Sequence, residues 1–231
     1  MSRRDPKTTR ASPPRQLPIL LIAVVVLGVA ALIGYQLWTN RPAATVGTVD
    51  YPTGLTPDGY PYKGNPEAKI IIEEYSDFQC PVCARYTREV APRLDEKYVK
   101  AGRVYYIFRY FPFLGPESFR AAEAAACAAE QGKFWEYERM VFANQRGENL
   151  GWFSDDRLIG FATRVGLDRG AFENCLLSGK YRDFVRSAAD AGRQRGVRAT
   201  PTIFINGEKI EGLYDVTFYE TYIDTLLRQG Q

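Results

Sequence analysis

Two cysteines three positions apart, Cys80 and Cys83, are the residues whose type and spacing most clearly indicate chemistry. Such a pair can close a small disulfide, bind a metal ion together, or pack in a core. The surrounding residues favour a disulfide. The β-branched run 70–72 predicts a buried strand just before the pair, and apolar residues at helical spacing over 84–100 predict a helix after it.

The junction of this strand and helix predicts an activated thiol. Pro81 suits the first position of a helix, where its missing N–H is not needed and its φ is already helical. Cys80 is then expected to be the N-cap residue, with its sulfur facing the unpaired N–H groups of the first turn. The positive end of the helix dipole favours a thiolate there. The pair is therefore predicted to be redox-active.

The composition limits the other functions that the chain can have. Its 231 residues are 45% hydrophobic, which is enough for one globular domain and a further segment. The net charge of +3 is concentrated at the N-terminus, because residues 1–15 carry +4 and leave −1 for the remainder. Nucleic-acid binding by the folded part is therefore not expected. The sequence has no histidine, which excludes histidine-based acid–base catalysis.

An uncharged stretch of 22 residues, Leu17–Trp38, follows the basic segment 1–16. As a helix it would extend about 33 Å, enough to cross a bilayer core, and the basic segment would remain in the cytoplasm. A cleaved signal peptide is the alternative, although its apolar core usually has only about 7–15 residues. We expect a single-pass anchor in the cell membrane, contacting lipid through residues 17–38, with the catalytic domain outside the cytoplasm.

The remaining chain divides into a linker and a folded domain. Residues 39–66 are rich in proline and glycine and predict a tether. Residues 67–231 predict an α/β domain that begins with strand, helix and strand over 70–111, with a kink at Pro92. A helical region follows over about 115–196. Two strands then flank the hairpin turn Asn206-Gly207, and the last helix, 215–228, follows.

Five stretches in this order form a recognisable pattern: Glu74-Tyr75-Ser76-Asp77-Phe78-Gln79-Cys80-Pro81-Val82-Cys83, Phe111-Pro112-Phe113, Ala126-Cys127-Ala128, Gly132-Lys133-Phe134-Trp135 and Ala199-Thr200-Pro201-Thr202-Ile203-Phe204-Ile205-Asn206-Gly207. They resemble the DsbA-like branch of the thioredoxin superfamily, and the match covers about residues 64–228. The resemblance implies a thioredoxin fold with a central mixed four-stranded sheet, an inserted helical subdomain, and thiol–disulfide exchange on secreted proteins.

The resemblance also implies roles for single residues. Cys80 resembles the exposed nucleophile that forms a mixed disulfide with substrate, and Cys83 resembles the buried thiol that resolves it. Pro201 matches the family's cis-proline, and Thr200 before it would offer its backbone to an extended substrate strand. Glu74 occupies the place of a buried carboxylate that exchanges a proton with Cys83. An ordinary carboxylate at a strand end is the alternative for Glu74.

The two residues between the cysteines, Pro81 and Val82, are expected to contact substrate. Strong oxidants of this family carry histidine within the motif, where a histidinium stabilises the thiolate and makes the disulfide more oxidising. Val82 cannot do this. We therefore expect a milder oxidant, with a reduction potential more negative than the about −120 mV of a strong oxidant.

The other two cysteines, Cys127 and Cys175, lie on predicted helices of the insert. They could be two small buried hydrophobic residues, since free cysteine is often buried. An oxidising compartment and the even number of cysteines favour a structural disulfide between them. A zinc site that uses all four cysteines is disfavoured, because this pair lacks the close spacing of zinc ligands.

Together these features predict a thiol–disulfide oxidoreductase that donates its Cys80–Cys83 disulfide through a mixed disulfide at Cys80. A reductase or disulfide isomerase of the same fold is the alternative, because direction depends on potential and partners. A chaperone or binding module without turnover has no need of either thiol. We expect no cofactor and no metal. The expected partners are exported cysteine-containing proteins as substrates and a membrane redox partner.

Overall fold

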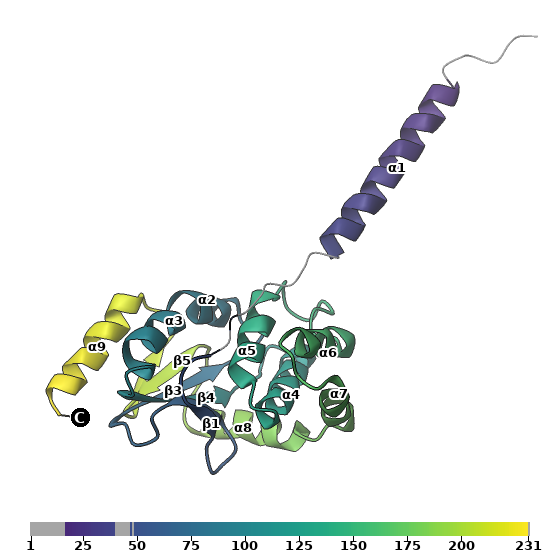
Figure 1. Cartoon of the computed structure of the whole chain (residues 1–231). Helices are drawn as coiled ribbons and strands as arrows, with labels where there is room; N and C mark the ends of the chain where they lie inside the picture. Colours follow the sequence, from purple (N-terminus) through teal and green to yellow (C-terminus); the bar gives the residue numbers. More distant parts are fainter. Residues whose placement is uncertain (1–16, 40–46, 48, 231) are drawn as a thin grey trace, which may run out of the picture. The chain divides into compact units, whose positions relative to one another are not determined.

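The computed structural model describes residues 17–39, 47 and 49–230 (Figure 1). The chain divides into two units between residues 42 and 43, and each unit is described by itself. The first unit contains one described helix, and the second contains the sheet and the other described helices. The predicted basic tail, residues 1–16, lies outside the described residues.

The helix of the first unit, α1, spans Leu17–Thr39. In the part of the chain that the structure describes, no helix is both long and apolar enough to span a membrane. The predicted anchor over 17–38, its lipid contact and the extracytoplasmic placement of the domain are therefore corrected. A single-pass membrane protein is not supported.

The second unit is built on a mixed sheet of six strands in the order β1-β2-β4-β3-β5-β6. The central strands, β3 (Ile70–Ser76) and β4 (Val104–Tyr110), are parallel, and the other neighbouring strands are antiparallel. Both central strands are mostly buried, as expected for strands covered on two faces. The predicted α/β fold with a mixed sheet is confirmed, but the sheet has six strands rather than four.

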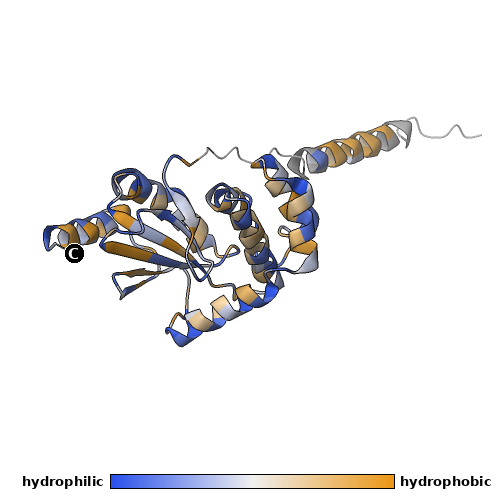
Figure 2. Cartoon of the chain, turned by 60° about the horizontal axis from the view of Figure 1, so that its bottom comes forward, coloured by the Kyte–Doolittle hydropathy of each residue, from blue (hydrophilic) through white to orange (hydrophobic). Residues whose placement is uncertain are grey.

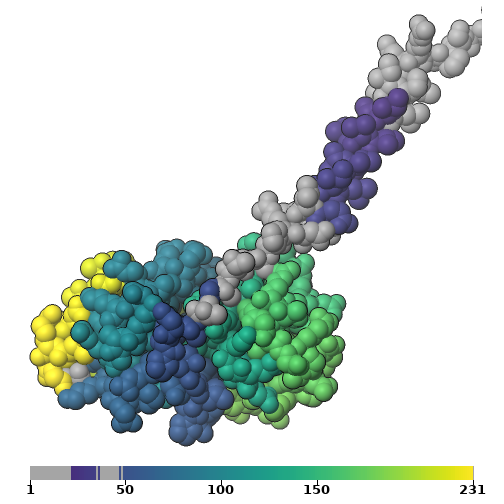
Figure 3. Space-filling model, in the orientation of Figure 1, coloured from purple at the N-terminus to yellow at the C-terminus, as the bar shows by residue number. Residues whose placement is uncertain are grey.

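The additional strands, β1 (Thr53–Leu55) and β2 (Pro61–Gly64), lie in the range 39–66 that was predicted to be a linker. They form a hairpin, and β2 also pairs with β4. Figure 3 shows this dark blue segment on the front face, between the blue-teal and green parts of the folded unit. The hairpin escaped prediction because its strands have three and four residues and contain Pro61 and Gly64, which are unfavourable in strands.

The helix after the cysteines is broken near the predicted proline kink. It consists of α2 (Pro81–Glu89), α3 (Ala91–Leu94) and a π-helical turn, η1 (Asp95–Val99). Pro92 has no N–H to donate to the preceding turn, so the regular α-helix ends just before it. After this break, Asp95 of η1 forms an ion pair with Lys63 of β2.

The helical insert between β4 and β5 contains five helices, close to the predicted range 115–196. A disulfide joins Cys127 of the first insert helix to Cys175 of the fourth, with Cα atoms 5.9 Å apart. The structure therefore contains the disulfide that the sequence suggested. The helices are α4 (Pro116–Glu130), α5 (Phe134–Ala143), α6 (Asp155–Arg164), α7 (Arg169–Ser178) and α8 (Arg182–Gln194).

The chain then returns to the sheet through β5 (Thr202–Ile205) and β6 (Glu208–Glu211). Asn206 and Gly207 between them have φ values of 48° and 87°, as a tight hairpin turn requires. The last helix, α9 (Val216–Arg228), begins where the Asp215 carboxylate accepts a hydrogen bond from the Phe218 N–H. In Figure 2 the strands at the centre are largely hydrophobic, and hydrophilic residues lie on the outer sides of the helices.

Candidate active site

The nucleophile predicted from the sequence, Cys80, is the N-cap residue of α2, and Pro81 occupies the first turn. Cys80 is 6% exposed, while Cys83 one turn further into the helix is fully buried. Neither cysteine is in a disulfide, so the structure shows the dithiol form. Of the two residues between them, Pro81 is exposed and Val82 is half-buried. Both cysteines are therefore buried, although Cys80, predicted to be the exposed nucleophile, is slightly more accessible than Cys83.

The pKa values of the two thiols also differ: the more exposed Cys80 has the lower pKa, and the fully buried Cys83 has the higher one. The pKa of Cys80 is lowered from 9.0 to about 6, because Cys83 donates a hydrogen bond to its sulfur and the backbone N–H groups of Val82 and Cys83 also point toward it. Burial opposes this shift. Burial instead raises the pKa of the Cys83 thiol, and its hydrogen bond to Cys80 adds to the effect. At neutral pH the dithiol therefore holds a thiolate on Cys80 and a proton on Cys83.

The predicted substrate-facing segment lies directly beside Cys80. The peptide bond between Thr200 and Pro201 is cis, as predicted for Pro201. When Cys80 is protonated, its thiol donates a hydrogen bond to the Thr200 carbonyl oxygen, which lies 3.4 Å from the sulfur. Thr200 and Pro201 immediately precede β5, so two segments 120 residues apart in the sequence meet at the nucleophile.

Glu74, the predicted proton-exchanging acid, is 2% exposed on β3. It shares one face of the sheet with Ser76, because side chains two positions apart on a strand point to the same side. Burial raises the pKa of both Glu74 and Cys83, and the Ser76 side chain opposes the rise for each, so the acid and the resolving thiol share this neighbour. Burial raises the pKa of Glu74, while a hydrogen bond of 2.6 Å from the Tyr106 hydroxyl opposes the rise. The structure thus makes Glu74 a buried acid.

The sequence reasoning missed the polar side chains around Glu74. Lys63 is buried and pairs with Asp95 at 2.7 Å, and its ammonium lies 4.3 Å from the ring centres of both Tyr106 and Trp135. No signal in the sequence of β2 marks Lys63 as buried. A signal did exist for a further buried acid, Glu138 of α5, which occupies the apolar face of its helix between Phe134 and Val141 at spacings of four and three.

Residues 57–225 match the model of a family described as thioredoxin. The chain belongs to this thioredoxin family. It is also 29% identical over 148 residues to a protein named probable disulfide bond formation protein D of Bacillus cereus, covering 62% of this chain and 68% of that protein. The crystal structure of alpha-DsbA1 from Wolbachia pipientis superposes with a TM-score of 0.67 at 26% identity, covering 76% of this chain and 94% of that one. The predicted resemblance to the DsbA-like branch of the thioredoxin superfamily is confirmed.

A further relative of this thioredoxin-family chain carries a different name. The Na(+)/H(+) antiporter NhaA 3 of Salinispora tropica is 33% identical over 175 residues, which cover 75% of this chain. The chain spans about a quarter of that relative's length, since the match covers 26% of it. Most of the antiporter therefore lies outside the matched region.

Proposed function

We propose that this chain is a thiol–disulfide oxidoreductase that works through Cys80 and Cys83. The observation that carries the proposal is the asymmetry of the pair. Cys80 is 6% exposed and has a pKa lowered to about 6, whereas Cys83 is fully buried and has a raised pKa. A low-pKa, accessible thiol with a second thiol one turn away is the arrangement that disulfide exchange requires.

The proposed reaction starts from the Cys80–Cys83 disulfide. A substrate thiolate attacks the Cys80 sulfur, and the electron pair of the broken bond leaves with Cys83, which then takes up a proton. A second substrate thiolate attacks the substrate sulfur of the mixed disulfide and releases Cys80 as a thiolate. The substrate gains a disulfide and two electrons remain on the dithiol. A separate redox partner must then reoxidise the pair.

We propose disulfide donation rather than reduction, because the lowered pKa of Cys80 stabilises the dithiol form at neutral pH. A stabilised dithiol makes the disulfide more oxidising. Val82 supplies no positive charge to the thiolate, so the expected reduction potential is more negative than about −120 mV. The substrates proposed are cysteine-containing proteins, with Thr200 and the residues after Cys80 as the surface that contacts them.

The test is the oxidation of a reduced peptide with two cysteines by the oxidised protein. The wild-type chain is expected to convert the peptide thiols to a disulfide, and Cys80→Ser is expected to abolish this. The Cys127→Ala/Cys175→Ala double variant is the matched control, since it also removes one disulfide but is expected to retain activity. Equal rates for wild type and Cys80→Ser would refute the proposal.

A further inference from the structure

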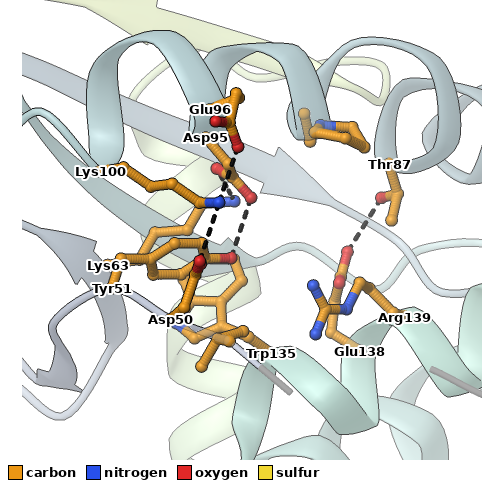
Figure 4. Close-up of a pocket in the computed structure, with 13 residues that line it drawn as sticks. Asp50, Tyr51, Lys63, Thr87, Asp95, Glu96, Lys100, Trp135, Glu138 and Arg139 are labelled. Carbon is orange, nitrogen blue, oxygen red and sulfur yellow. Dashed lines mark hydrogen bonds and ion pairs between the residues drawn. The ribbon is translucent and has the colours of Figure 1, made fainter. Parts of the chain in front are cut away.

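A cavity of about 420 Å3 lies behind the active site and does not include either redox cysteine (Figure 4). It is bounded by β2, α2, α3, η1, α5 and the segment before β1. At its mouth the Asp50 and Glu96 side chains are 67% and 71% exposed, and both are ion-paired with Lys100. At its base lie the buried side chains of Lys63, Asp95 and Glu138. The cavity thus connects solvent with buried charged groups.

Glu138 projects from α5 into this cavity (Figure 4). It is 4% exposed and accepts a hydrogen bond of 2.9 Å from the Thr87 hydroxyl of α2. Its pKa is raised to about 8, chiefly by burial and also by the negative charge of Glu74, while Lys63 and the hydrogen bond from Thr87 oppose the rise. A carboxyl group with this pKa exchanges protons readily near neutral pH.

Glu74 itself has no direct route to solvent. It is 2% exposed, and its Oε1 atom is buried without a hydrogen-bond partner. Tyr106 covers the other oxygen, and the Lys63 ammonium lies over the Tyr106 ring. Residues 63 and 106 are directly opposite each other in the pairing of β2 with β4, so these groups form a row across one face of the sheet. The row leads from Glu74 to the base of the cavity.

We propose that Glu138 is the group through which Glu74 exchanges its proton with solvent, and that it is therefore a positioning residue for the chemistry of Cys83. The inference rests on the proposed function, because it assigns a route to the proton that Cys83 must gain and lose. Other titratable or charged groups face Glu138 from every element around it. They are Asp50, Tyr51, Lys63, Glu74, Asp95, Glu96, Lys100 and Arg139.

The step that needs this route is resolution of a mixed disulfide in the oxidising direction. Cys83 gives its proton to the Glu74 carboxylate, and its thiolate attacks the Cys80 sulfur. The bond between Cys80 and the bound thiol breaks, and that thiol leaves with the electron pair as a thiolate. Glu74 then passes the proton to Glu138, which releases it through the cavity. Formation of the mixed disulfide involves only Cys80 and needs no such transfer.

The test separates these two steps in a single turnover of the reduced protein with glutathione disulfide between about pH 5 and pH 9. Acid-quenched samples are analysed by mass spectrometry for the mixed disulfide and for the intramolecular disulfide. For Glu138→Gln, formation is expected at the wild-type rate. Resolution is expected to slow about tenfold, below the roughly 10²–10⁴ typical of a direct general acid or base, and to lose its inflection near pH 8.

Three matched variants keep the test specific. Glu136 is a buried carboxyl group on the same helix, but it does not line the cavity, and it accepts a hydrogen bond from the Val49 N–H. Glu136→Gln should therefore leave both steps unchanged. Thr87→Val removes the hydroxyl that donates to Glu138 and should move the inflection to higher pH, whereas Thr87→Ser should not.

Two results would overturn the inference: the wild-type pH profile of resolution in Glu138→Gln, or equal slowing in Glu136→Gln and Glu138→Gln. Absence of any mixed disulfide in the wild-type protein would instead refute the proposed function. The two failures are therefore distinguishable.

Discussion

The pKa of Cys80 has a consequence for stability that can be measured without any substrate. In the folded dithiol this pKa is lowered from 9.0 to about 6. A group whose pKa is depressed by folding stabilises the folded state above its unfolded pKa, and this contribution is lost as the pH falls through the folded pKa. The stability of the dithiol form is therefore expected to rise between about pH 6 and pH 9. The disulfide form has no thiol to titrate at this site.

The magnitude follows from the two pKa values. A difference of 3.0 between 9.0 and about 6 corresponds to about 4 kcal/mol at full ionisation, at about 1.36 kcal/mol per unit. Between about pH 5 and pH 8 the expected gain is about 3 kcal/mol. Cys83 titrates above this window, because burial raises its pKa. Carboxyl groups that titrate alike in both redox forms contribute equally to the two free energies of unfolding, so their contributions cancel in the difference.

The assay is urea unfolding of the dithiol and disulfide forms of the same protein at several pH values. The difference between their free energies of unfolding is expected to shift by about 3 kcal/mol in favour of the dithiol form from about pH 5 to pH 8. The Cys80→Ser variant, treated with reductant, should show no such rise. A difference that is flat with pH, or that moves in the opposite direction, would refute the assignment of a stabilised thiolate to Cys80.

Three further predictions concern the surroundings of the pair. Cys127→Ala/Cys175→Ala should lose about 4 kcal/mol of unfolding free energy, since the disulfide spans 48 residues; a loss below about 1 kcal/mol in urea unfolding would contradict this. Asp77→Ala should cost about 3 kcal/mol or more in the same assay, because its carboxylate accepts three backbone hydrogen bonds, and an unchanged midpoint would contradict it. Val82→His should raise the reduction potential measured against glutathione, whereas a lowered or equal potential would contradict the role given to the missing charge.

The sequence was sufficient to predict the parts of the fold that depend on local signals. The insert helices lie within the predicted range 115–196, and the last helix, α9, lies within the predicted range 215–228. The turn Asn206-Gly207 also has the expected backbone conformation. These features could be predicted because capping and turn formation involve residues only a few positions apart.

The parts that escaped prediction depend on contacts between distant residues. Lys63 is buried because β2 pairs with β4 and because Asp95 of the broken helix neutralises its charge. Neither partner is near it in the sequence. Likewise, the hydrogen bond from Tyr106 to Glu74 exists because the parallel pairing of β3 and β4 brings the two strands together. The cysteine motif and the proline before β5 were found because their residue types carry the chemistry themselves.

The most direct test of the central claim is to trap substrate on the Cys83→Ala variant. This variant retains the Cys80 thiol but lacks the thiol that would resolve a mixed disulfide. When it is incubated with a peptide disulfide and quenched with acid, mass mapping is expected to find the peptide joined to Cys80. The Cys80→Ser variant should carry no peptide on Cys83, because that thiol is fully buried. Trapping on Cys83 and not on Cys80, or on neither cysteine, would contradict the assignment of Cys80 as the nucleophile.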